Sequence, residues 1–291
     1  MDKSRQVTKA MEAVSAAKMR KAQLRALQGR PYAKAAVSIL KRVATTPDLL
    51  RHPLAASREI RHALYIVITS DKGLAGALNS AVLRAVWSDI ETSGLSRGAV
   101  SVIAVGRKAN DFFTARGISV DVFHPHTDEI TSELITALVH EAADRFKGGA
   151  VDSVKIAYQN FISTFEQRPM LHTMFPLSLS DLQKLVHDIV PARGKFSDTP
   201  IEANGVFYNI EPSEGEVLNH VLPKLAAIFV YHALLESQAS EHSARMVAMK
   251  SVSDKADELK KSYTLEFNKI RQSVITREVS EITGGMEALA S

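Results

Sequence analysis

The 291-residue chain contains no cysteine. A chain without thiols cannot build a disulfide scaffold, a cysteine nucleophile, a cysteine-ligated zinc site or a dithiol switch. No apolar run approaches the roughly 18 residues that a membrane span needs. The first residues, MDKSRQVTKAM, also lack the apolar core of a secretory signal. We therefore expect a protein of the cytosol, or of a membrane surface that it reaches through a partner.

Glycine and proline are missing from two long stretches, residues 1–28 and 224–283, which are rich in helix-forming residues. Sixty helical residues would span about 90 Å, more than the width of a small domain. Apolar residues recur every three or four positions in the second stretch, at Met249, Val252, Ala256, Leu259, Tyr263, Phe267, Ile270 and Val274. The pattern predicts that this apolar stripe packs against the N-terminal helix in an antiparallel coiled coil. We expect Gly284 and Gly285 to end the C-terminal helix.

Between these stretches, β-branched apolar segments alternate with helical ones. The expected strands are 63–70, 99–106, 118–124 and 151–161, the expected helices are 76–91, 107–116 and 128–147, and a proline-containing edge strand covers 167–177. Such alternation predicts an α/β fold: a Rossmann-like domain with a mostly parallel sheet. We divide the chain into an N-terminal helix (1–45), the α/β domain (60–211, with a loop and a short helix over 180–210) and a C-terminal helix (212–291).

The positive charge is concentrated at the N-terminus. Residues 1–43 carry eleven lysines and arginines against two acids, whereas the whole chain has a net charge of only +4. This segment favours an acidic partner or a solvated helix face. It has one aromatic residue, Tyr32, and no fold for base readout, so we expect no nucleic acid among the partners.

No segment predicts catalysis. The loop 70–79, SDKGLAGALN, follows a strand and opens a helix, so its backbone N–H groups could face a phosphate, but it matches no nucleotide-binding fingerprint. His124, His126 and Asp128 alternate in a loop without a further ligand motif, which favours a solvated loop over a metal site. We expect no acid–base constellation, no cofactor and no metal.

Six stretches resemble one known family, the gamma subunit of F-type ATP synthases. They are QVTKAMEAVSAAKMRKAQ (6–23), RPYA (30–33), SDKGLAGALN (70–79), YNIEP (208–212), ASEHSARMVAMK (239–250) and TLEFNKIRQSVITREVSEITGG (264–285). Their order and spacing agree with the family over essentially the whole chain.

The resemblance implies a noncatalytic central-stalk rotor. The two long helices would form an asymmetric shaft inside a ring of three alpha and three beta subunits. The α/β domain would sit on the c ring and bind the epsilon subunit. Proton-driven rotation of the c ring would then be coupled to ATP synthesis, or ATP hydrolysis to reverse rotation. The protein would be peripheral, at the cytoplasmic face of a bacterial inner membrane, and would associate with the membrane only through the complex.

The resemblance also implies contact residues, carried over by motif. Those toward the alpha and beta ring are Met11, Arg245, Arg271, Gln272, Thr276 and Glu278. Those toward the c ring are Tyr208 and Glu211. The chain departs from the family pattern in having only five residues before Gln6, Ala75 where cysteine is common, and Arg277 where glutamine is common.

Two other readings of the residues stay open at this point. The first is a phosphate- or nucleotide-binding α/β protein with a coiled-coil arm. The second is a basic coiled-coil adaptor for a nucleic acid or a membrane surface, for which a steep salt dependence of binding would be diagnostic.

Overall fold

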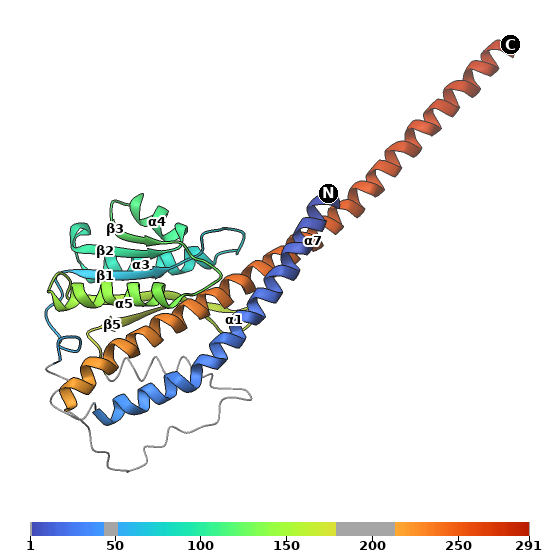
Figure 1. The fold of residues 1–291 in the computed structure, drawn as a ribbon. Coiled ribbons are helices and arrows are strands. Elements are labelled where there is room, and N and C mark those ends of the chain that lie inside the picture. Colours follow the sequence, from blue (N-terminus) through green and yellow to red (C-terminus); the bar gives the residue numbers. More distant parts are fainter. Residues whose placement is uncertain (1, 44–51, 179–212, 291) are drawn as a thin grey trace.

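The computed structural model describes residues 2–43, 52–178 and 213–290 (Figure 1). The elements are α1 (Asp2–Val43), β1 (Ala63–Ile68), α3 (Leu78–Ser93), the 3-10 turn η1 (Arg97–Ala99), β2 (Val100–Val105), α4 (Arg107–Thr114), β3 (Ser119–His124), α5 (Ser132–Lys147), β4 (Ser153–Phe161), β5 (Gln167–Phe175) and α7 (Glu214–Ala290). The alternation of strands and helices is therefore as the sequence predicts. The predicted loop and short helix at 180–210 lie outside the described residues.

The five strands form one sheet in the order β3-β2-β1-β4-β5. The first four are parallel, with Ile66 of β1 opposite both Ile103 of β2 and Ile156 of β4. β5 runs antiparallel to β4 and lies at the edge of the sheet. Pro169, which has no N–H to give to a ladder, is tolerated in this edge strand. The mostly parallel, Rossmann-like sheet and its proline-containing edge strand are both confirmed.

Helices cover both faces of the sheet, as Figure 1 shows. On β1, alternate side chains point to opposite faces: Leu64, Ile66 and Ile68 join the core under α5 and α7, whereas Tyr65 and Val67 join the core under α3 and α4. Because both faces are covered, all six residues of β1 are buried. This explains why the strand is continuously apolar rather than alternating.

The C-terminal helix α7 is a single helix of 77 residues, about 115 Å long. The Ser213 hydroxyl accepts a hydrogen bond from the Glu216 backbone N–H at 3.3 Å and caps the N-terminus of the helix. Pro223 lies inside the helix without ending it. The prediction that Gly284 and Gly285 end the helix is wrong, because α7 continues through both to Ala290.

The first part of α7 is a core helix. One 18-residue window within Gly215–Thr283 has a mean hydropathy of 1.3, enough by length and composition to cross a membrane, although no uninterrupted apolar run is that long. Half of that window is buried inside the protein, and Leu222, Phe229 and Leu234 of α7 belong to the core on the sheet. This core position accounts for the apolar composition of the segment.

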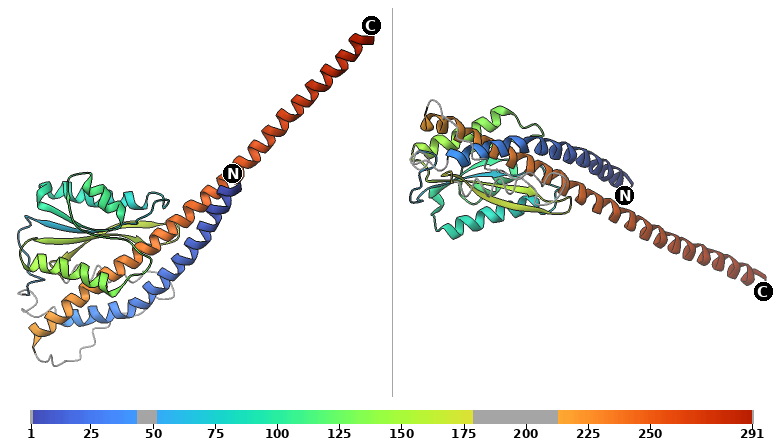
Figure 2. Two further views of the ribbon diagram at one scale, coloured as in Figure 1. Left: turned by 45° about the horizontal axis from the view of Figure 1, so that its top comes forward. Right: turned by 90° about the horizontal axis from the view of Figure 1, so that it is seen from below.

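Helix α1 runs antiparallel to α7 and accompanies it from near its start to its middle, in all views of Figures 1 and 2. Among the α1 side chains whose exposure is described, Ser15, Met19 and Ala22 are buried, spaced by four and three residues. Near its start, Arg5 Nε lies 3.5 Å from Asp257 Oδ1 of α7. The predicted two-helix coiled coil is therefore present, with its upper end near Asp257.

The predicted extent of that coiled coil is wrong. Met249 is buried, but the later stripe residues Leu259, Tyr263, Phe267, Ile270 and Val274 are between 37% and 65% exposed. The 42 residues of α1 cover about 63 Å, far less than the length of α7. We call residues 258–290, which extend past the start of α1, the distal helix (Figure 2).

Candidate functional site

Two loops meet α7 and α1 at the edge of the sheet where the parallel strands end. One loop follows β1 and contains residues 69–77, and the other follows β3 and contains residues 125–131. In the first loop, the Asn79 side chain accepts from the Ser70 backbone N–H at 3.0 Å and donates to the Ser70 hydroxyl at 2.7 Å. Asn79 therefore fixes the loop, and we call this meeting point the junction.

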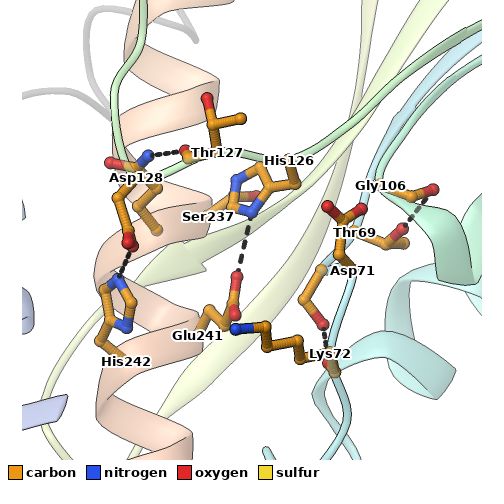
Figure 3. A network of polar contacts seen from close by, with 12 residues as sticks. Thr69, Asp71, Lys72, Gly106, His126, Thr127, Asp128, Ser237, Glu241 and His242 are labelled. Atoms are coloured by element: carbon orange, nitrogen blue, oxygen red, sulfur yellow. Dashed lines mark hydrogen bonds and ion pairs between the residues drawn. The ribbon is translucent and has the colours of Figure 1, made fainter.

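One buried chain of charges at the junction is centred on Glu241 of α7 (Figure 3). Its carboxylate lies 2.6 Å from Arg245 Nη2 and 3.1 Å from His126 Nδ1. The three side chains are only 7–10% exposed. Burial alone would raise the pKa of Glu241, but the bonds to His126 and Arg245 outweigh it and lower that pKa to about 2. Glu241 is therefore a buried, permanently ionised group at neutral pH.

A second chain of polar contacts links α1 to α7 through the loop after β3. Asp128 Oδ2 lies 2.5 Å from Lys18 Nζ of α1, and Asp128 Oδ1 lies 3.3 Å from His242 Nε2 of α7. Burial lowers the pKa of His242 in spite of the neighbouring carboxylates. The Gln238 side chain adds a hydrogen bond to the Thr127 carbonyl at 2.7 Å. Three segments that are distant in sequence are thus joined here.

The loop 70–79 presents a hydrogen-bond acceptor, the Gly73 carbonyl oxygen, to α7. Arg245 Nη2 donates to the Gly73 carbonyl oxygen at 3.3 Å, so this point of the loop holds a cation. A phosphate site requires converging N–H donors instead. The loop is therefore engaged by the chain's own arginine.

The structure brings together two of the residues that the family resemblance singles out. Met11 of α1 and Arg245 of α7 both line a cavity of about 630 Å³ between α1, the two loops and α7. Apolar side chains of α1, such as Val7 and Val14, form one wall, and the charged groups of the junction form the other. Arg245 itself is 90% buried and already paired with Glu241.

The other predicted contact residues lie elsewhere. Arg271, Gln272, Thr276 and Glu278 are all exposed on the distal helix, starting about 39 Å along α7 from Arg245. Among them, the Thr276 hydroxyl donates to the Gln272 carbonyl at 2.9 Å. Tyr208 and Glu211 lie outside the described residues.

The expectation of a solvated loop at His124–Asp128 is wrong for His126, whose side chain is 7% exposed. The pairing of His126 with Glu241 across 115 residues has no local sequence signal. The available signals were the alternation of His124, His126 and Asp128 in the loop and the closely spaced Glu241, His242 and Arg245 on a helix. Among the residues that the structure describes, no group of three or more histidines and acids is placed to hold a metal ion.

Comparisons with known proteins agree with this architecture. A family model described as ATP synthase matches residues 1–289. The ATP synthase gamma chain of Heliobacterium modesticaldum is 37% identical over 290 residues, covering 98% of this chain and 94% of that one. The gamma chain of Pelotomaculum thermopropionicum is 38% identical over 287 residues, with the same coverage.

Solved structures share the fold. A chain of the Euglena gracilis mitochondrial ATP synthase (OSCP/F1/c-ring) is similar with a TM-score of 0.62 and 22% identity, covering 99% of this chain and 90% of that one. A chain of the Tetrahymena thermophila mitochondrial ATP synthase central stalk and c ring has a TM-score of 0.61 and 24% identity, covering 85% and 99%. With a family match over nearly its whole length and relatives above 35% identity, this chain belongs to the ATP synthase gamma-chain family.

Proposed function

We propose that this chain is the noncatalytic central-stalk rotor of an ATP synthase. Its distal helix would turn inside a ring of three alpha and three beta subunits, and its α/β domain would bind the c ring and the epsilon subunit. Proton-driven rotation of the c ring would then change the nucleotide affinity of each beta site in turn. The protein would be peripheral at the cytoplasmic face of a bacterial inner membrane, without a cofactor of its own.

One observation carries this proposal: the bare apolar stripe of the distal helix. Its large apolar side chains are 37–71% exposed: Leu259, Tyr263, Leu265, Phe267, Ile270, Val274, Ile275, Val279, Ile282 and Met286. Ten large apolar side chains exposed along one helix mark an interaction site, because exposing them to water is unfavourable. The 33 residues of the distal helix form a rod of about 50 Å. A rod of that shape fits a ring-shaped partner that surrounds it rather than a flat partner surface.

Charged residues interleave with the stripe, which suits a rotating contact. Lys255 pairs with Glu258 at 2.6 Å, and Arg277 lies 3.8 Å from Glu281, all with side chains 67–71% exposed. Exposed ion pairs of this kind are worth about 0–1 kcal/mol each, so they can break and reform as the partner surface changes. The buried charges of the junction, in contrast, are paired within the chain, which supports a structural role rather than catalysis.

The first experiment is reconstitution with the alpha and beta subunits of the same source. We expect a stable complex in which ATP hydrolysis is strongly increased by this chain. No complex and no activation would overturn the rotor assignment. A parallel measurement of binding to detergent-solubilised c ring tests the other end, and replacing both Tyr208 and Glu211 by alanine should weaken that binding.

A double variant tests the contacts of the distal helix. Arg271→Ala/Gln272→Ala should lower ATP hydrolysis by the reconstituted complex roughly five- to thirtyfold, as expected when an interface contact worth about 1–2 kcal/mol is removed. Both side chains are exposed, so the melting temperature of the isolated chain should not change. Arg168→Ala, on the exposed edge strand β5, is the matched control for loss of an arginine. Equal hydrolysis by the double variant and the control would contradict these contacts.

A further inference from the structure

Two arginines and two aromatic rings form a cluster on the outer side of α3 and α4. The rings of Trp87 and Phe112 lie edge to face, with their centroids 6.1 Å apart. The Arg116 guanidinium lies over the Phe112 ring, 3.5 Å from its centroid, and the Arg97 guanidinium lies 6.0 Å from the centroid of Trp87. Both rings are partly buried against the core under α3 and α4, whereas both arginines are exposed. We call these four residues the arginine patch.

The two guanidinium groups are held in place without a counter-ion. Arg97 Nη1 donates to the Arg116 carbonyl oxygen at 3.3 Å, and Arg116 Nη1 donates to the Phe112 carbonyl oxygen at 3.2 Å. Within the described parts of the chain, no carboxylate forms an ion pair with either group. Glu91, one turn after Trp87, accepts from Trp87 Nε1 at 2.6 Å instead. Each guanidinium therefore keeps unused N–H donors that face solvent.

The arginine patch lies at the edge of the sheet opposite the junction. Arg97 belongs to η1, which directly precedes β2, and Arg116 lies between α4 and β3. Both arginines are thus at the edge where the parallel strands begin, whereas the junction lies where those strands end. A strand of six residues is about 20 Å long. A partner bound at the patch would therefore leave α1, α7 and the junction free.

The chemistry of the patch favours a protein partner that carries carboxylates. A guanidinium stacked on a ring presents a planar fork of donors, which matches the two oxygens of a carboxylate. Tryptophan and arginine are also the residues that most often carry the binding energy of protein interfaces. An anionic membrane, in contrast, is bound by a larger group of lysines and arginines. Here the exposed acids Glu91 and Asp111 lie on the same two helices and reduce the local positive charge.

We propose that the arginine patch docks an acidic segment of a partner protein. The carboxylates of that segment bind Arg97 and Arg116, and the segment packs on the exposed side of the Trp87 ring. This inference goes beyond the proposed rotor function, which assigns no partner to this edge of the sheet. It also stands independently of that function, because it uses only the contacts within the patch.

The test uses the fluorescence of Trp87, which is the only tryptophan of the chain. Its emission reports on the patch, so an anion that binds the basic helix α1 instead does not disturb the measurement. The full chain is titrated with an acetylated peptide of eight glutamates. We expect a saturable change in Trp87 emission, and we expect added salt to weaken the binding because the contacts are between exposed charges.

Three double variants separate the patch from charge in general. Arg97→Gln/Arg116→Gln should weaken the peptide roughly tenfold or more, because charge-assisted hydrogen bonds are lost. Arg97→Lys/Arg116→Lys keeps the charge without the planar fork and should weaken it roughly threefold. Arg20→Gln/Arg107→Gln removes the same charge from two other exposed arginines, and should change the affinity by less than about twofold. If a double variant of the patch fails to fold, Arg97→Gln alone should weaken the peptide in the same direction.

The proposal is overturned if the peptide leaves the emission of Trp87 unchanged, or if the glutamine variant of the patch binds as tightly as the control. Equal binding by wild type and the lysine variant would also overturn it, because charge alone would then be sufficient. Vesicles containing phosphatidylglycerol should leave the emission unchanged; if they shift it and the peptide does not, the patch binds a membrane surface instead. A failure of the chain to activate hydrolysis with alpha and beta subunits would overturn the rotor function only.

Discussion

Two leucines of α7 give a direct test of how this helix is stabilised. Leu234 is 0% exposed and belongs to the core on the sheet, whereas Leu265 is 71% exposed on the distal helix. The same change, leucine to alanine, can therefore be made at a buried and at a bare position of one continuous helix. Alanine favours helix slightly more than leucine does, so neither change harms helix formation itself.

The expected magnitudes are far apart. Leu234→Ala loses buried apolar area and leaves a cavity, which costs about 2–5 kcal/mol. For a folded unit of about 150–250 residues, each kcal/mol lowers the melting temperature by roughly 2–4 °C. Leu234→Ala should therefore lower the melting temperature of the α/β domain by about 4–20 °C. Leu265→Ala should change the free energy of unfolding of the isolated chain by no more than about 0.5 kcal/mol.

The assay is thermal unfolding followed by circular dichroism and calorimetry at several protein concentrations. The concentration series matters because the exposed stripe can drive self-association. Equal destabilisation by the two variants would refute the reasoning, since it would show that the distal helix is packed in the isolated chain. If the reasoning holds, Leu265→Ala should weaken assembly with the alpha and beta subunits although it leaves the stability of the free chain unchanged.

Two further predictions concern pH and a close backbone approach. Acid should lower the free energy of unfolding in two steps. The first step lies below about pH 6.5, because burial lowers the pKa of His242 and so favours the neutral ring in the folded protein. The second step lies between pH 4.5 and 2 and costs up to about 3 kcal/mol, because protonation of Glu241 removes the ion pairs that lower its pKa to about 2. Urea titrations at a series of pH values measure this, and greater stability at pH 5 than at pH 7 would contradict it. Gly106→Ala should cost more than about 4 kcal/mol, because its φ is +97° and an added Cβ would lie 2.1 Å from the Thr69 carbonyl oxygen. Gly98→Ala, with no atom within 4 Å of the added Cβ, is the control, and a small effect of Gly106→Ala in chemical denaturation would be inconsistent with this geometry.

Local patterns were sufficient for the elements of the fold. The apolar run of β1 predicts a strand buried on both faces, and Pro169 predicts an edge strand, because each of these effects acts within a few residues along the chain. The prediction that Gly284 and Gly285 end the helix was wrong, since glycine in a helix costs only about 1 kcal/mol relative to alanine and does not forbid the helix. The apolar periodicity of the C-terminal stretch gave the helix and its apolar face correctly.

The sequence by itself determined the strand–helix alternation, the two long helices and the family motifs. Only the tertiary structure decided how far α1 accompanies α7, because periodicity shows that a face is apolar and not what covers it. Only the structure joined His126 to Glu241 and Lys18 to Asp128, since these pairs are more than 100 residues apart. The segment Glu236–Arg245 shows the same limit: its polar composition is typical of a solvated helix, whereas the structure buries it against the α/β domain.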